Sequence, residues 1–199
     1  MKTMVILLTF TLYVFGGDFE KGFIAYENGH YKKAVEYYQK AIKNGDAKAL
    51  FFLGVMYGYG RGVSKNMHKM VQLYEQSASK GFSPAQFKMF LIYLTDNKGI
   101  NRRNKQKAVM YLKLSAAQGF PRAVSMLARE YEDGLLLKGN LHKAAMLWKQ
   151  LADNGDGEAC CKVSGIYDKG KGVEQNKRIA KKYYSKAISF DAICAPIKD

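Results

Sequence analysis

The sequence predicts an all-α protein, a right-handed α-α superhelical solenoid of about five helix-turn-helix repeats. Three observations lead to this prediction. Marker residues recur at intervals of 36, 38, 36 and 36 residues along the chain. Apolar residues between the markers follow the period of 3.6 that is typical of helices. Only three prolines occur in 199 residues, so long segments are free to be helical.

The repeat consists of five columns of residues that keep one register. Asparagine begins the second half of a repeat, where its side chain can accept hydrogen bonds from the first free amides of a helix. Glycine ends that helix, since a left-handed C-terminal residue costs glycine little. Alanine and tyrosine mark the other columns. The columns are Ala34, Met70, Ala108, Ala144 and Ala180; Gly45, Gly81, Gly119, Gly155 and Asp191; Ala49, Ala85, Ala123 and Ala159; Tyr57, Tyr93, Tyr131 and Tyr167; and Asn66, Asn104, Asn140 and Asn176.

Two kinds of helix alternate between these markers. The first helix of a repeat has the apolar spacing of Leu50, Leu53 and Tyr57, and the second has that of Val71 and Tyr74. The two extra residues of the 38-residue interval fall in the loop inside the third helix pair. The predicted helices are 19–28, 31–44, 47–58, 66–80, 83–95, 104–118, 121–133, 140–154, 157–168 and 176–190.

The N-terminal residues 1–17 are expected to be a signal peptide. Lys2 precedes an apolar run of 12 residues, from Met4 to Phe15, and Gly16 and Gly17 follow it. A positive residue, a short apolar run and small residues in this order are typical of secretory signals, whereas a membrane-spanning helix needs about 20 apolar residues. We therefore expect a secreted or periplasmic protein with no stable membrane span after cleavage. A buried first helix is the alternative.

Charge and cysteine content restrict the partners and the redox chemistry. The net charge of +15 favours anionic partners, either a protein or peptide with an acidic surface or an envelope polysaccharide. Nucleic acid is not expected, because no recognition motif occurs. Cys160 and Cys161 are sequence neighbours that rarely pair with each other, so Cys194 can bond to one of them and leave the other free. We take Cys161 and Cys194 as the candidate disulfide.

The repeat motif resembles the Sel-1-like repeat family, which is related to the tetratricopeptide repeats. The resemblance covers residues 19–190. It divides the chain into a tetratricopeptide-like first repeat (18–46), four Sel-1-like repeats (47–191) and a C-terminal tail (192–199). It implies recognition of proteins or ligands, often by exported bacterial members. The matching residues are Ala49, Leu53, Gly54, Tyr57, Gly60, Gly62, Val63 and Gly81, then Ala159, Tyr167, Gly170, Gly172, Val173 and Ala180.

An enzymatic function is the alternative to a binding role. Secreted, cysteine-rich members of the family are described as penicillin-binding with weak β-lactamase activity, and two cysteines eight residues apart staple their repeats. Here Cys160 holds the second such position, but Ala152 holds the first. Ser77 and Lys80 match Ser-x-x-Lys, yet neither Ser-Asp-Asn nor Lys-Thr-Gly accompanies them. We therefore expect no catalytic residue.

No metal or cofactor is expected either. His30, His68 and His142 lack the spacing of metal ligands, and we expect His68 and His142 to face solvent near helix starts. The glycine-rich loops at 58–63 and 169–173 lack Gly-Lys-Ser/Thr and recur as repeat loops, so they are predicted to be turns rather than phosphate-binding loops.

The main functional prediction is a non-catalytic binding scaffold. By analogy with tetratricopeptide proteins, the first helix of each repeat should line a concave face that takes an extended peptide. A structural adaptor that oligomerises through the end bearing Cys194 is a further interpretation. The residues predicted to meet a partner are Lys48, Phe51, Val55, Phe87, Leu91, Arg122, Ser125, Arg129 and Glu158, with Cys161 beside them.

Overall fold

Ten α-helices and no strand make up the part of the chain that the computed structural model describes, residues 17–95, 103–195 and 197. The chain divides into two compact units between Arg103 and Asn104. The prediction of an all-α fold is confirmed, and every predicted helix is present with both ends within two residues of the expected positions.

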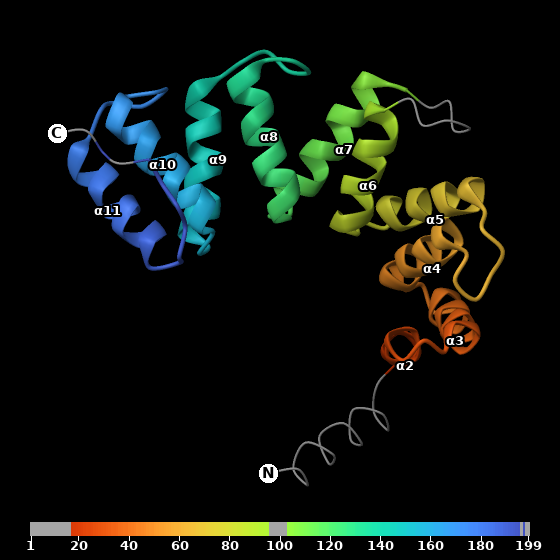
Figure 1. Cartoon of the computed structure of the whole chain (residues 1–199). Helices are drawn as coiled ribbons and strands as arrows, with labels where there is room; N and C mark the ends of the chain where they lie inside the picture. Colours follow the sequence, from red (N-terminus) through yellow and green to blue (C-terminus); the bar gives the residue numbers. More distant parts are fainter. Residues whose placement is uncertain (1–16, 96–102, 196, 198–199) are drawn as a thin grey trace, which may run out of the picture. The chain divides into compact units, whose positions relative to one another are not determined.

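In the first unit, each helix packs against the next along the chain (Figure 1). We call the first helix of a repeat helix A and the second helix B, so that α2, α4 and α6 are A helices and α3 and α5 are B helices. The first-unit helices are α2 (Asp18–Glu27), α3 (Tyr31–Lys43), α4 (Ala47–Tyr59), α5 (Met67–Ser79) and α6 (Ser83–Leu94).

The second unit follows the same scheme, with consecutive helices packed on one another. Its A helices are α8 and α10. Its helices are α7 (Lys105–Ala117), α8 (Pro121–Asp133), α9 (Leu141–Asp153), α10 (Gly157–Lys169) and α11 (Lys177–Ile188).

The helix ends follow the repeat columns. Asn66 is the N-cap of α5, and its side chain accepts a hydrogen bond of 2.9 Å from the Lys69 amide; the other three column asparagines cap α7, α9 and α11 in the same way. The column glycines adopt left-handed backbone, as at Gly45 with a φ of 86°. Asp191 stands in the glycine column and is the one non-glycine residue with positive φ, 55°, among the described residues. The predicted start and stop signals are therefore confirmed.

Small A-helix residues allow large B-helix rings to lie in the core. Tyr38 is fully buried, and a Cβ at Gly22 would come within 2.7 Å of its ring. Gly54 has the same relation to Tyr74, at 2.8 Å. Burial raises the pKa of both tyrosine hydroxyls well above the usual value. Phe90, which replaces Gly54 in the next repeat, is itself fully buried, so a large A-helix residue takes up core volume there.

The Gly-x-Gly loops have a structural role. Gly62 has a φ of 71°, and a Cβ on it would lie 2.7 Å from the Tyr31 backbone. Gly172 approaches the Leu141 backbone in the same way, at 2.4 Å. Each loop therefore seats on the start of the preceding B helix, where only glycine fits. This placement agrees with the prediction that these loops are turns.

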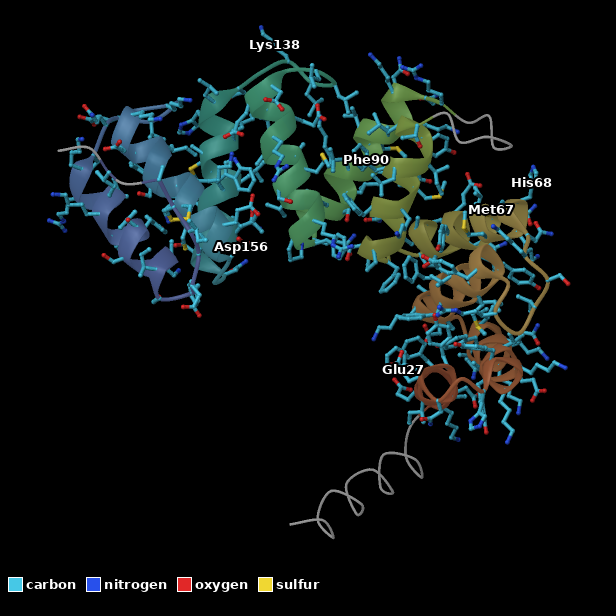
Figure 2. The ribbon with its side chains drawn as sticks, viewed as in Figure 1. Glu27, Met67, His68, Phe90, Lys138 and Asp156 are labelled. Carbon is cyan, nitrogen blue, oxygen red and sulfur yellow. A yellow bond between two sulfur atoms is a disulfide. The ribbon has the colours of Figure 1, made fainter. Side chains whose placement is uncertain are left out.

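The α8–α9 loop lacks the Gly-x-Gly contact and is held by a different interaction. The Leu136 amide donates a 3.0 Å hydrogen bond to Oε2 of Glu130, a residue only 8% exposed. Lys138 points away from the two helices (Figure 2). A buried carboxylate thus orders a loop that lacks the second glycine.

Two sequence predictions fall outside the described residues. The first is the signal peptide, of which only Gly17 is described, as the N-cap of α2. The second is the loop that contains the two-residue insertion, most of which is not described. None of the described helices has the length and apolar content needed to span a membrane.

Candidate binding surface

The helix-A surface of the first unit is rich in phenylalanine. Ring centroids lie 5.4 Å apart for Phe19 and Phe52, 5.6 Å for Phe23 and Phe52, and 5.6 Å for Phe51 and Phe52. Phe51 also contacts Phe82, at 5.4 Å. These contacts join α2, α4 and the start of α6 in one continuous aromatic strip. Phe23 remains 39% exposed, so part of the strip is accessible.

A cation lies over this strip. Lys48 is exposed, and its Nζ is 5.7 Å from the centroid of the Phe19 ring. Phe51 and Val55 follow Lys48 on the same face of α4 and are half-buried. The structure therefore brings three of the predicted residues together on α4, beside an aromatic strip. Phe19, Phe23 and Phe52 were missed from the sequence, although their spacing with Phe51 on helix-A positions was the available signal.

The two predicted residues on α6 differ in accessibility. Leu91 is half-buried and retains some surface. Phe87 is only 9% exposed, and its ring lies 5.7 Å from that of Phe90, centroid to centroid. The prediction that Phe87 meets a partner is therefore corrected: its side chain belongs to the core, because a large apolar ring at this position gains more from burial than from exposure.

The predicted residues of the second unit lie on neighbouring A helices. Arg129 of α8 forms a 3.2 Å salt bridge with Glu158 of α10, and both side chains are more than half exposed. Ser125 donates to the carbonyl of Arg122, one turn earlier on α8. Glu158 thus offsets the charge of Arg129, and Arg122, which is exposed, is the cation of α8 better placed to meet an acidic partner.

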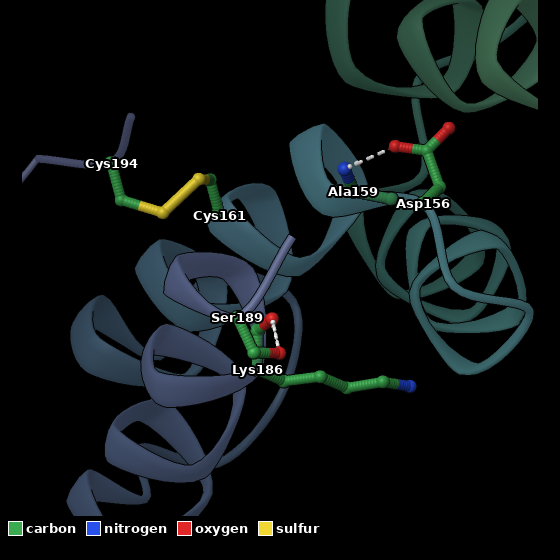
Figure 3. Close-up of a disulfide and its surroundings, with 6 residues drawn as sticks. All are labelled: Asp156, Ala159, Cys161, Lys186, Ser189 and Cys194. Carbon is green, nitrogen blue, oxygen red and sulfur yellow. Dashed lines mark hydrogen bonds between the residues drawn. A yellow bond between two sulfur atoms is a disulfide. The ribbon is translucent and has the colours of Figure 1, made fainter. Parts of the chain in front are cut away.

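The C-terminal tail lies against α10. Cys161 and Cys194 form a disulfide with a Cα–Cα distance of 5.2 Å (Figure 3). Tail residues also contact the start of α10, since a Cβ on Gly157 would meet Ala192 at 3.0 Å. A groove of about 450 Å³ is lined mostly by α10 and the tail, with Glu132 of α8 also in its wall; Glu158 and Cys161 are among the α10 residues that line it. The predicted binding residues of α10 therefore sit beside a covalently held segment of the same chain.

Cys160 is the remaining, unbonded cysteine. It is fully buried, and burial raises the pKa of its thiol. Its Sγ contacts the carbonyl of Ala152 at 3.6 Å. Ala152 is the residue eight positions earlier, which holds the first position of the cysteine pair described above. The thiol is thus a packed core group facing the position of the missing staple.

The catalytic alternative has no accessible nucleophile at the position considered. Ser77 is fully buried, and its hydroxyl donates a 2.6 Å hydrogen bond to the Ala47 carbonyl. It ties helix B to the start of helix A in its repeat. Ser77 is therefore a packed residue that links the two helices of its repeat.

The histidines are dispersed. His68 lies with Met67 at the exposed start of α5 (Figure 2). His142, also exposed, has its Nδ1 3.1 Å from the Gly172 carbonyl and so helps to seat the Gly-x-Gly loop. Among the residues that the structure describes, no three His, Cys, Asp or Glu side chains gather as metal ligands would.

The repeat geometry can be compared with known proteins. The model of the Sel1 repeat matches residues 22–46, 47–82, 83–120, 121–156 and 157–189, nearly the whole described chain. The chain belongs to the Sel1 repeat family. It is thus an all-α solenoid of five Sel1 repeats, and the family resemblance inferred from the sequence is confirmed.

Two solved structures and one curated relative illustrate this kinship. A Sel1 repeat protein from Oxalobacter formigenes is 30% identical and covers 79% of this chain and 64% of its own, with a TM-score of 0.65. A protective antigen present in uropathogenic Escherichia coli strains, which displays an SLR fold, is 26% identical with a TM-score of 0.73, covering 87% of this chain and 38% of its own. Chitin synthase regulatory factor 3 of Schizosaccharomyces pombe is 31% identical over 143 residues, 69% of this chain.

The Sel1 chain is short beside these proteins. It spans 15% of the length of the fission-yeast relative, and well under two thirds of the other curated relatives that it matches first. What is shared is therefore the repeat array.

Proposed function

We propose that this Sel1 repeat chain is a non-catalytic scaffold that binds a protein or peptide through its helix-A surface. The observation that carries the proposal is the aromatic strip of Phe19, Phe23, Phe51 and Phe52 with Lys48 above it. Aromatic side chains contribute much of the binding energy at interfaces because they bury a large area at little entropic cost. A relative named as a chitin synthase regulatory factor supports a role in regulation through binding.

The partner is proposed to be acidic. The chain carries a charge of +15, and the helix-A surface presents Lys48 in the first unit and Arg122 in the second. A surface of this sign accelerates encounter with anionic partners and disfavours basic ones. Arg129 contributes less, since Glu158 already neutralises it.

Selection from a phage-displayed library of random dodecapeptides tests this proposal. We expect enrichment of peptides that combine Asp or Glu with aromatic or aliphatic residues. Lys48→Glu should lower the affinity for an enriched peptide by about tenfold, because it turns an attraction into a repulsion. Phe23→Ala should lower this affinity by a similar factor. Lys65→Glu, an exposed site in the α4–α5 loop, is the charge-matched control. Equal affinity of all three variants and the unmodified protein would reject the helix-A surface.

The proposed site of action is outside the cytoplasm, in the periplasm or beyond. The signal-like pattern of residues 1–17 and the Cys161–Cys194 disulfide support it, since disulfides persist in oxidising compartments. N-terminal sequencing of the protein from the periplasmic fraction of a Gram-negative host tests export. The expected first residue is Gly17 or Asp18. Recovery from the cytoplasm alone, still beginning at Met1, would contradict this part of the proposal.

A further inference from the structure

A second surface of the first unit lies on the opposite side of α4 from the aromatic strip. It is a groove of about 580 Å³ between α3, α4 and α5. Its floor contains Leu50 and Leu53 of α4 and Leu73 of α5, which belong to the hydrophobic core and keep only a small exposed edge. At 100° per residue, Leu50 and Leu53 project about half a turn away from Lys48 and Phe51. The groove is therefore separate from the proposed peptide-binding surface.

The rim of the groove is cationic. Lys40 and Lys43 stand on the α3 side and Lys69 on the α5 side, with Glu36 as the acidic residue among the lining. Three lysines and one glutamate thus line the groove around its apolar floor. A ligand that fits must pair an apolar body with an anionic group, since an anion on the rim gains charge-assisted hydrogen bonds.

The repeats of this chain explain why the groove is open. The equivalent positions three repeats later are 110 residues along, where Tyr183 replaces Leu73 and Asp153 replaces Lys43. There the Tyr183 hydroxyl donates a 2.6 Å hydrogen bond to Asp153, bridging α11 and α9. Lys186 adds a second bridge, donating to the carbonyl of Ala152. Leucine is shorter than tyrosine and has no donor, so Leu73 leaves the corresponding space between α3 and α5 unbridged.

We propose that this groove binds a single-chain anionic amphiphile of the fatty-acid type, with the acyl chain on the leucine floor and the carboxylate at the lysine rim. Its volume lies within the range of about 300–1,000 Å³ that is typical of small-molecule sites. An acidic peptide is less suited to it. Its backbone amides and carbonyls would lose water over the leucine floor, where Gln39, Gln76 and Tyr57 are the uncharged polar residues of the lining, and unpaired polar groups are costly to bury.

Titration calorimetry with dodecanoate, below its micelle concentration, tests the proposal. We expect saturable binding of one molecule per chain that weakens as salt is added. Dodecyltrimethylammonium, with the same chain length and the opposite charge, should not bind in the groove. The double variant Lys43→Gln/Lys69→Gln should lower the affinity for dodecanoate by about fivefold or more, since it removes one cation from each wall of the groove. Lys32→Gln/Lys65→Gln removes two exposed lysines that do not line the groove and should leave the affinity unchanged.

A closing variant tests the geometry of the groove, with Lys43→Asp alone as the control for the change of charge. Leu73→Tyr/Lys43→Asp transplants the bridging pair of the last repeat into the groove and should abolish dodecanoate binding while retaining the helical circular dichroism spectrum. If the closing variant fails to fold, the lysine pair and its control still decide the question. No saturable binding, equal binding of the cationic amphiphile, or equal affinity of the lysine pair and its control would overturn the proposal. So would displacement of dodecanoate by an alternating Asp/Leu hexapeptide, since the groove would then be a peptide site.

Discussion

Two glycines in the middle of A helices should respond in opposite ways to the same substitution. Gly54 of α4 faces Tyr74, whose ring atoms lie 2.8 and 2.9 Å from the position of an added Cβ, and the Met70 carbonyl is 3.3 Å away. Gly165 of α10 has no atom within 4 Å of that position apart from its chain neighbours and the nearby backbone of its own helix. Gly54→Ala is therefore expected to destabilise the protein, and Gly165→Ala to stabilise it.

The magnitude follows from two terms. Replacing glycine by alanine inside a helix contributes about 1 kcal/mol of stability at either site. At Gly54 the new methyl must also displace a buried ring and approach a backbone carbonyl, and such overpacking costs about 1–3 kcal/mol. The helix term is common to both variants, so the difference in unfolding free energy between them, about 1–3 kcal/mol, measures the close packing of Tyr74 and the Met70 carbonyl on Gly54.

Thermal unfolding followed by circular dichroism measures this difference. For a chain of this size, 1 kcal/mol corresponds to roughly 2–4 °C in Tm. Hydrogen exchange of peptides from α4–α5 and from α10–α11 then assigns each effect to its helix pair, because the glycines lie in different units. If Gly54→Ala raised the Tm as much as Gly165→Ala, the close packing of Tyr74 on Gly54 would be refuted.

Three further predictions concern single interactions. Tyr38→Phe should raise stability by about 1 kcal/mol, because the fully buried hydroxyl has no hydrogen-bond partner among the described residues. Cys161→Ser/Cys194→Ser should lower stability by about 2–4 kcal/mol, since the bond closes a loop with a sequence separation of 33. The pKa of Asp153 is lowered by the hydrogen bond from Lys149. This carboxylate therefore stabilises the folded state above its unfolded pKa of about 4, and the contribution is lost as the pH falls through the lowered folded value. Asp153→Asn should flatten the acid limb of the stability profile.

Each of these predictions has a clear contrary result. A Tm for Tyr38→Phe several degrees below that of the unmodified protein would mean that the hydroxyl has a stabilising partner. For the disulfide, Cys160→Ala is the control. Its Tm should still fall when the disulfide is reduced, whereas the Tm of the double serine variant should not change on reduction. An acid limb of unchanged slope in Asp153→Asn would remove Asp153 from the acid unfolding of the second unit.

The sequence is a good guide to the fold because its signals are local. An asparagine that caps a helix and a glycine that ends one act within four residues of the chain. Repetition strengthens these signals, since the asparagine and the glycine each recur four times in one register and each copy supports the others. Even Asp191, the exception in the glycine column, adopts the left-handed backbone that the register predicts.

The binding surface was harder to predict, because exposure depends on neighbours distant in sequence. Lys48 and Phe87 both occupy helix-A positions, yet the first is exposed and the second is buried. The sequence alone predicts Arg129 as an unpaired cation, but in the structure its Nη2 lies 3.2 Å from Oε1 of Glu158. The periodicity identifies the helix face but not the side chains that will cover it.

The amino-acid sequence by itself determined that this chain is an array of five helix pairs and where each helix begins and ends, because capping and periodicity are properties of neighbouring residues. The tertiary structure alone decided which surfaces are open. The groove lies over Leu73, whereas in the last repeat the same position holds Tyr183, which bridges the two B helices. The choice between leucine and tyrosine at this position matters only because two B helices lie on either side of an A helix. Packing between segments 30 residues apart in the sequence places those two helices side by side.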